Sequence, residues 1–296
     1  MKKILIASTA LALTAGFAAA DAPVLSGSAR MGVTYDDSIV APGSKMAFSS
    51  RVRFVVTAAG TTDGGLSFGA STRLDQFSGN NAALGSGGTT NGDSTVFLSG
   101  AFGKITMGDV GGAADALVGQ TDGVGYGPND GLHEIGFIGT TKTAMYYEMS
   151  TAGGLTFGVG AGQVGSDELN AAVKYTTDTF SVALGYEDDS TAVVGHNRVS
   201  VLGAITLGAA TIKAKYMTDS NINDDSYSVS ASSIFGGVGV TAFYTHFGAS
   251  DSDNIGLGGS YDLGGGAAIK GAVISVGSPI AGADSMVADL GVTFSF

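Results

Sequence analysis

The stretch Ser285–Phe296 reads SMVADLGVTFSF and alternates between two kinds of side chain with a period of two. Successive side chains of a β-strand point to opposite faces, so this alternation predicts a strand with two different faces. One face is wholly apolar and carries Met286, Ala288, Leu290, Val292, Phe294 and Phe296. The other is mostly polar or small and carries Val287, Asp289, Gly291, Thr293 and Ser295. Such a strand fits a β-barrel wall between lipid and water.

The first twenty residues have the three parts of a secretory signal peptide. Lys2 and Lys3 are basic, the segment 4–17 is almost wholly apolar, and 18–20 is Ala-Ala-Ala. We therefore expect residues 1–20 to be cleaved and the mature chain, 21–296, to begin at Asp21. An exported chain that ends in an amphipathic strand and a carboxyl-terminal Phe predicts a multi-pass β-barrel of the bacterial outer membrane.

The composition supports a barrel and excludes several other classes. Gly is abundant (49 of 296 residues) and Pro is scarce (4), which disfavours long helices and suits uninterrupted strands. There is no Cys, so disulfides and thiolate metal sites cannot stabilise the fold. Removing Lys2 and Lys3 takes the formal charge from −12 to −14. The mature chain therefore lacks the basic patch that nucleic acid requires.

Period-two segments separated by turns recur along the mature chain. The predicted strands are 24–35, 48–58, 66–75, 94–101, 105–109, 143–150, 155–163, 169–176, 180–187, 197–205, 211–218, 226–233, 238–247, 254–261, 267–276 and 285–296. These sixteen segments place both chain ends on one side of the membrane, as bacterial barrels require. Some have fewer than the roughly nine residues that a spanning strand needs, so we expect them to extend into the adjoining loops. The segment 238–247 fits the alternation poorly.

The two faces differ in the solvent that they suit. In 180–187, for example, Phe180, Val182, Leu184 and Tyr186 alternate with Ser181, Ala183, Gly185 and Glu187. Bulky aliphatic and aromatic residues on one face and Gly, Ser, Thr and charged residues on the other indicate a lipid-facing exterior around a wet interior. A soluble or surface β-structural protein with an adhesive role remains an alternative, because alternation alone does not identify the solvent at each face.

Several stretches resemble the Rhodobacter-type general porins. They are Leu25–Val33 (LSGSARMGV), Thr61–Ala70 (TTDGGLSFGA), Thr95–Ile105 (TVFLSGAFGKI), Tyr261–Gly266 (YDLGGG) and the ending from Met286. The resemblance implies an all-β fold, a 16-stranded antiparallel transmembrane barrel that forms a homotrimer in outer-membrane lipid and lipopolysaccharide. It also implies passive diffusion of small hydrophilic solutes and ions through a water-filled channel. A substrate-specific outer-membrane channel is the nearest alternative, but Tyr126, Phe137 and Tyr146 are too few for an aromatic binding track.

The same resemblance implies that one external loop folds inward to narrow the channel. By position this constriction loop is Val110–Lys142, the longest connection in the chain. A loop of this length in a compact protein is usually functional. Its acidic residues, with one that just precedes it, are Asp109, Asp115, Asp122, Asp130 and Glu134. Lys142 is its only Lys or Arg.

Four arginines on three consecutive predicted strands share the inward face. They are Arg30, Arg51, Arg53 and Arg73, here called the arginine wall. On the lipid face each would cost about 2–4 kcal/mol near the midplane, so we expect them to face the lumen. Acids across from them would create a transverse field that favours small hydrophilic solutes over apolar ones, which must displace oriented water. Alternatively, the arginines pair with nearby wall acids such as Asp75.

The residues do not predict an enzyme or a required cofactor. His133, His196 and His246 are far apart in sequence, and no G-x-S-x-G motif occurs. The loop acids leave a structural calcium ion open as a hypothesis, although they show no fixed ligand spacing. The negative charge of the chain and the arginine wall point to opposite ion preferences, so the sequence does not decide between cation and anion selectivity.

Overall fold

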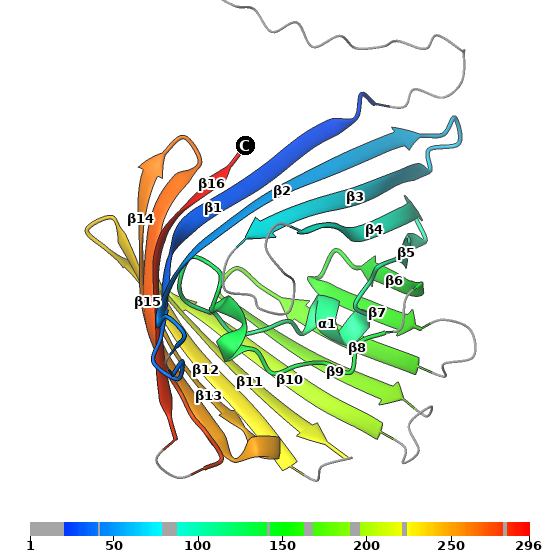
Figure 1. The fold of residues 1–296 in the computed structure, drawn as a ribbon. Coiled ribbons are helices and arrows are strands. Elements are labelled where there is room, and N and C mark those ends of the chain that lie inside the picture. Colours follow the sequence, from blue (N-terminus) through cyan, green and yellow to red (C-terminus); the bar gives the residue numbers. More distant parts are fainter. Residues whose placement is uncertain are drawn as a thin grey trace, which may run out of the picture.

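The computed structural model of the chain describes residues 21–40, 42–78, 88–140, 143–162, 168–189, 196–220, 224–280 and 283–296. The predicted signal peptide and Lys142 lie outside them. Within the described residues, sixteen antiparallel strands close into one barrel (Figure 1). Each strand pairs with its neighbours in sequence, and the first pairs with the last. The predicted antiparallel barrel is confirmed.

The elements are named in chain order. The strands are β1 (Val24–Asp36), β2 (Met46–Thr61), β3 (Ser67–Ser78), β4 (Gly88–Gly100), β5 (Gly103–Gly108), β6 (Ala144–Ser150), β7 (Leu155–Ala161), β8 (Glu168–Thr176), β9 (Phe180–Asp189), β10 (His196–Leu207), β11 (Ala210–Asp219), β12 (Asp224–Phe235), β13 (Val238–Phe247), β14 (Ser252–Gly264), β15 (Ala267–Val276) and β16 (Ser285–Ser295). The helical segments are α1 (Ala113–Leu117), η1 (Asp130–His133) and η2 (Gly248–Ser250). None of the helices in the described part of the chain is long and apolar enough to cross a membrane.

The barrel closes where its two terminal strands meet. Backbone hydrogen bonds join Gly27 and Phe296 in both directions, with N–O distances of 2.7 and 3.0 Å. The turn between β14 and β15 lies at the same end of the barrel and contains three consecutive glycines with positive φ, 264–266. Glycine suits this tight reversal because other residues rarely adopt positive φ. Both ends of the described barrel therefore lie on the side of the tight turns.

The alternation read from the sequence sets the two faces of the wall. On β9, Val182 and Leu184 are 45% and 47% exposed, whereas Ala183 and Glu187 are buried. On β16, Leu290 is 64% exposed, while the carboxylate-bearing Asp289 beside it is buried. Large apolar side chains therefore cover the outside of the barrel, where only lipid can shield them from water.

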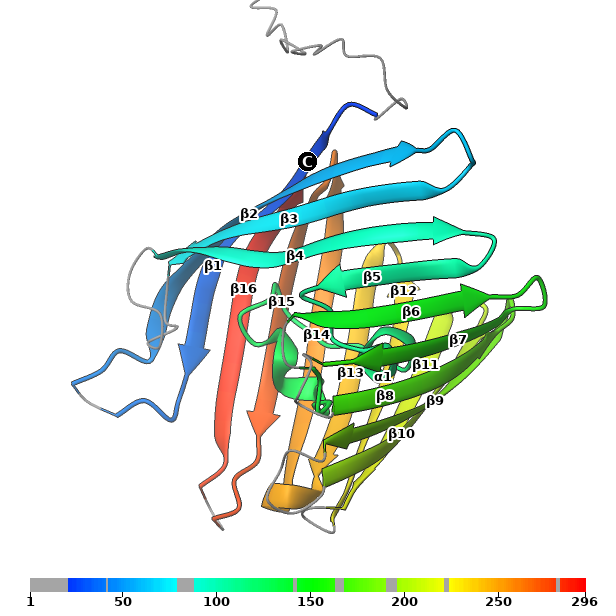
Figure 2. The ribbon, with the colours of Figure 1, turned by 90° about the vertical axis from the view of Figure 1, so that its right-hand side faces the viewer.

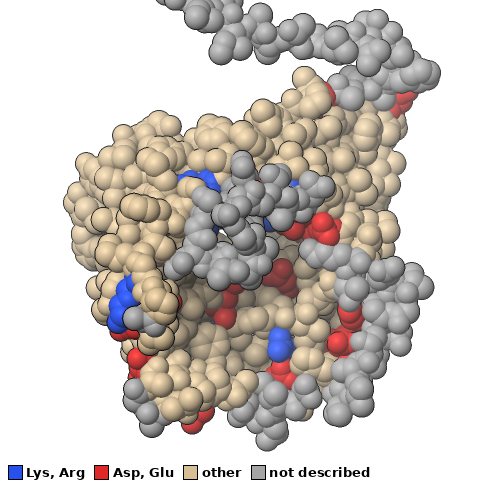
Figure 3. Space-filling view, in the orientation of Figure 1, with Lys and Arg blue, Asp and Glu red and all other residues tan. Residues whose placement is uncertain are grey.

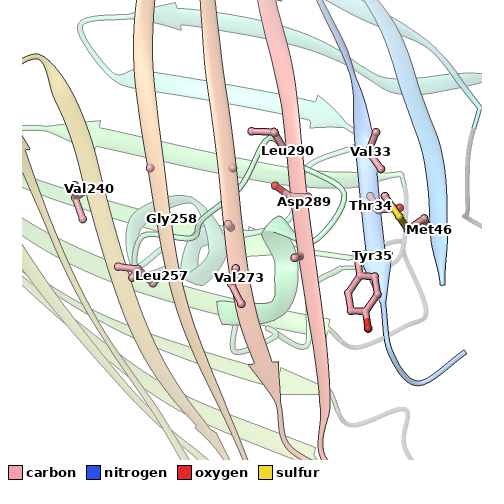
Figure 4. A pocket seen from close by; sticks show the side chains of 14 residues that line it. Val33, Thr34, Tyr35, Met46, Val240, Leu257, Gly258, Val273, Asp289 and Leu290 are labelled. Carbon is pink, nitrogen blue, oxygen red and sulfur yellow. The ribbon is translucent and has the colours of Figure 1, made fainter.

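The outer face also contains shallow hollows with apolar linings. One of about 730 Å³ lies over the strands on both sides of the closure (Figure 4). Val33 of β1, Leu257 of β14, Val273 of β15 and Leu290 of β16 contribute to its lining. An apolar outer surface of this kind contradicts the alternative of a soluble protein with a dry aliphatic interior.

Two details of the strand prediction are corrected. The short segments 105–109 and 143–150 were expected to lengthen, but β5 and β6 have only 6 and 7 residues, and β7, with 7 residues, is shorter than its predicted segment 155–163. β5 stops because Gly108 turns the chain away with a φ of 123° and the Asp109 carboxylate accepts a hydrogen bond from the Ser94 N–H. β13 matches the poorly alternating segment 238–247, and its inward Phe243 is buried. An aromatic residue is accommodated there because it packs under an internal loop rather than facing the channel.

Candidate functional site

The segment between β5 and β6 folds into the barrel. Figures 1 and 2 both show α1 and the neighbouring turns of this segment inside the ring of strands. Its first part packs through Ala113 and Leu117 against Tyr146 and Ala172 of β6 and β8. The Ala113 N–H also donates to the Asn170 side chain on β8. Inward-facing polar and small side chains of the wall therefore receive the start of the loop.

The middle of the loop follows the wall onward. Thr121 shares a 2.7 Å hydrogen bond with Ser228 of β12, and the Asp122 N–H donates to Ser230 at 2.9 Å. Val124 then packs in an apolar cluster with Phe243, Ala272, Ile274 and Val287 of β13, β15 and β16. Two serines of β12 thus bind the loop, Ser228 through the Thr121 hydroxyl and Ser230 through the Asp122 N–H.

The tip of the loop reaches the strands at the barrel closure. Asp289 of β16 accepts hydrogen bonds from the Tyr126 N–H at 3.2 Å and from the Asn129 amide at 3.4 Å. Tyr126 is buried, and this burial raises the pKa of its hydroxyl, so the side chain stays neutral. The negative charges of Asp130 and Asp289 attract the guanidinium of Arg30, the first member of the arginine wall.

The return leg is held by side chains of β9, β10, β11, β13 and β14. The buried Lys215 amine donates to the Gln120 side chain at 2.9 Å and to the Ile135 carbonyl at 2.8 Å, and it lies 3.7 Å from the centre of the Phe137 ring. Gln120 is on the outgoing leg and Ile135 on the returning leg, and these two residues also form two hydrogen bonds with each other, so Lys215 binds both legs where they join. Arg198 of β10 donates to the Gly136 carbonyl at 3.0 Å.

Arg51, Arg53 and Arg73 of the arginine wall line the part of the barrel that the loop leaves open, and Arg30 contacts the loop tip at Gly127. The loop contacts β6 to β16 and reaches β1 only at its tip, whereas the four arginines lie on β1, β2 and β3. Arg30 and Arg51 are cross-strand partners in the β1–β2 pair, so these two side chains are adjacent. Charged side chains of both signs are visible in the hollow of the molecule (Figure 3).

Two members of the arginine wall are paired with wall acids. Arg53 donates to both oxygens of Asp75, at 2.8 and 2.9 Å. Arg73 lies 3.2 Å from Asp75 and donates to Asp93 at 2.6 Å. In the part of the chain that the structure describes, Arg30 and Arg51 form no ion pair, and their Nε atoms have no hydrogen-bond acceptor. The alternative expectation, that the arginines pair with wall acids such as Asp75, is therefore correct for Arg53 and Arg73 and not for Arg30 and Arg51.

The five acids proposed for the loop occupy different positions. Asp115, Asp130 and Glu134 are exposed on the loop surface inside the barrel. Asp122 instead forms an ion pair with Lys213 of β11 at 2.5 Å, and Asp109 binds the wall backbone at Ser94. Three of the five acids are therefore exposed on the loop inside the barrel, and the other two bind the barrel wall.

Several residues that position the loop were not identified from the sequence as site residues. They are Asn170, Glu187, Arg198, Lys213, Lys215, Ser228, Ser230, Thr245, Asn254 and Asp289. Each side chain occupies a position of its strand that points inward, and the sequence pattern could therefore predict that it lines the polar interior. Parity does not distinguish a side chain that faces water from one that binds a loop.

A membrane barrel with an apolar exterior, a charged lumen and a loop folded inside it is a channel of the outer-membrane porin class. Tyr126 is buried between the loop and the wall, and Tyr146 is buried under the start of the loop, so these two residues do not form an aromatic binding track.

Comparison with known proteins identifies the family. A model of the Gram-negative porin family matches residues 7–278, so the chain belongs to this family. A porin of Rhodobacter capsulatus is 36% identical over an alignment 316 positions long, which covers 92% of this chain and 99% of the relative. Two engineered variants of the Rhodopseudomonas blastica porin match the fold with TM-scores of 0.77 and 0.76 at 21% identity, covering 93% of this chain and all of each variant.

The protein is therefore a general porin of the Gram-negative outer membrane. It forms a passive channel and has no enzymatic activity. The prediction of the family, the fold and the transport function is confirmed.

Proposed function

We propose that solutes cross the barrel between the arginine wall and the exposed acids of the constriction loop, and that this gap filters them by charge and polarity. The supporting observation is the path of the loop. It covers the wall from β6 to β16, touches β1 beside Arg30 only at its tip, and leaves β2 and β3, with the other three arginines, facing it. Small hydrophilic molecules and ions are the solutes that such a gap favours.

The physical basis is a field across the channel. One pair of unit charges about 10 Å apart interacts by only about 0.4 kcal/mol in bulk water. Several charges on each side add, and confined water screens them less than bulk water does. Water in the gap is then oriented, and an apolar solute gains nothing in return for displacing it.

Ion selectivity measured in planar bilayers tests this proposal. Under a salt gradient, the double substitution Arg51→Ser and Arg53→Ser should shift the reversal potential toward greater cation preference. An unchanged reversal potential would show that the arginine wall does not line the narrowest part of the channel.

We further infer that the functional unit is a homotrimer embedded in lipid and lipopolysaccharide. In support, the outer side chains of β1 and β2 are apolar and highly exposed, with Leu25 at 66% and Phe48 at 84%. At the loop end of β12 to β14, Tyr227 stacks on His246, and both His246 and Tyr244 bind Asp253, which suits a headgroup region. Conductance that appears in groups of three equal steps would support three channels per particle, and isolated single steps would oppose it.

The sequence also left open a structural calcium ion at the loop acids. Among the described residues, no group of three or more His, Asp and Glu side chains is arranged to hold a metal. We propose that the loop is held by its contacts with the wall and that calcium is not needed to order it.

A further inference from the structure

We propose that Tyr126 is a positioning residue: its ring latches the constriction loop to the seam between β1 and β16 and thereby fixes the width of the channel beside Arg30. The inference deepens the proposed constriction and rests on it for its conductance readout. The latch, defined here as Tyr126, Gly32, Gly291 and Asp289, joins elements from the middle and both ends of the chain.

The seam offers a bare patch of backbone. β1 and β16 are the two terminal strands, and Gly32 and Gly291 face each other in their register. Both have the inward parity of Arg30 and Asp289 on the same strands. Two glycines directly opposite each other leave a shallow space on the inner wall, with no side chain on either strand.

The ring of Tyr126 fills that space and spans the seam. A Cβ atom added to Gly291 would lie 2.7 Å from the ring's Cγ, and one added to Gly32 would lie 2.8 Å from its Cζ. The base of the ring therefore rests on β16 and its far end on β1. Tyr126 is only 3% exposed although it belongs to a loop inside a water-filled barrel.

Polar contacts fix the backbone on either side of the ring. Asp289 is buried and accepts hydrogen bonds from the Tyr126 N–H and the Asn129 amide. Gly125 and Gly127 flank the tyrosine with φ values of 94° and 123°. Their missing side chains leave room for the Asp289 carboxylate and the Arg30 guanidinium, respectively. The segment Gly125-Tyr126-Gly127 therefore fits closely against both β1 and β16.

This placement gives the latch an effect on the channel. Tyr126 is the middle residue of the Val110–Lys142 loop, where a long loop has the greatest freedom unless it is fixed. The latch holds this point against the wall, and the exposed Asp130 follows four residues later. Loss of the latch would allow the tip to move into the open part of the lumen, next to Arg30.

The test compares Tyr126→Ala with Tyr126→Phe by single-channel recording. Substitution of Tyr126 is preferable to substitution of the glycines, whose added Cβ atoms would also collide with the backbone of the neighbouring strand. Tyr126→Ala should increase open-channel current noise about twofold or more and lower the unfolding temperature by about 5 °C. Tyr126→Phe keeps the ring and should behave as the unmodified protein.

A cross-link separates positioning from simple space filling. The chain has no Cys, so Asn129→Cys and Asp289→Cys can be combined with Tyr126→Ala and joined by a short bifunctional thiol reagent. Cross-linking should restore the quiet current even though the ring is absent. Noise unchanged by Tyr126→Ala, or noise that the cross-link fails to reduce, would overturn the latch. Failure of the proposed constriction would appear instead as an unchanged reversal potential after substitution of the arginine wall.

Discussion

Arg53 donates two parallel hydrogen bonds to Asp75, at 2.8 and 2.9 Å, so the most firmly held guanidinium of the arginine wall is also one whose charge is compensated. Asp75 lies 3.2 Å from Arg73 as well and is 5% exposed. The arginine wall thus divides into a paired half, Arg53 and Arg73, and a less compensated half, Arg30 and Arg51. This division decides which substitutions should alter transport.

Arg51→Ser should shift the reversal potential toward cation preference more than Arg53→Ser does. Arg51 forms no ion pair among the described residues, whereas the charge of Arg53 is already offset by Asp75, which keeps Arg73 as a partner when Arg53 is removed. The measurement is the reversal potential in a planar bilayer under a salt gradient, with Lys45→Ser as a control at an exposed position outside the wall. Equal shifts for the two arginines would contradict this division.

Asp75→Asn should change selectivity in the opposite direction. Loss of the carboxylate leaves Arg53 and Arg73 with more positive charge toward the lumen, so anion preference should rise. The same substitution should lower the free energy of unfolding by about 1–3 kcal/mol, because the charge-assisted hydrogen bonds are lost. Bilayer recording and urea unfolding in lipid vesicles measure the two effects. A shift toward cations would show that Asp75 does not offset the wall.

Lys215→Met should loosen the constriction loop. The substitution leaves Gln120 and the Ile135 carbonyl with only the hydrogen bonds that Gln120 and Ile135 make to each other, and it removes the cation that lies over Phe137. We expect a loss of about 2–4 kcal/mol in unfolding free energy.

Lys213→Met is the matched control for Lys215→Met. It removes a half-exposed ion pair with Asp122 on the same strand and should cost less than about 1 kcal/mol. Thermal unfolding and cleavage of the loop by a protease report the difference. Similar effects from the two lysines would argue against a special role for Lys215.

Leu184→Arg should impair insertion of the barrel. Leu184 is 47% exposed on the outer face of β9, where a charge near the midplane costs about 2–4 kcal/mol. Ser181→Arg, on the inward parity of the same strand, should have a much smaller effect on unfolding in vesicles. A larger loss from the inward substitution would mean that the faces are assigned the wrong way round.

Removal of divalent cations tests the calcium hypothesis. Because the loop already has side-chain partners on β8 to β14, we expect a calcium chelator to leave the open-channel conductance unchanged. The unfolding temperature should also stay the same. If the chelator made the conductance noisy or larger, and added calcium restored the original conductance, a metal requirement would be established.

Much of this architecture could be read from local patterns. Alternation in Ser285–Phe296 and in Phe180–Glu187 identified both faces of their strands because side-chain direction in a strand depends only on parity. The inward parity of Arg30, Arg51, Arg53 and Arg73 followed from the same rule. Family resemblance added the inward loop, which no periodicity could have revealed.

The sequence by itself therefore determined the barrel, its polarity and the strands that carry the arginines, since these depend on neighbours along the chain. Only the tertiary structure decided which charges are compensated and where the loop is fastened. Asp75 pairs with Arg53 across β2 and β3, Lys215 joins two legs of the loop, and Tyr126 rests on glycines from opposite ends of the chain. Such contacts depend on distances between remote segments, and those distances exist only once the barrel has closed around the loop.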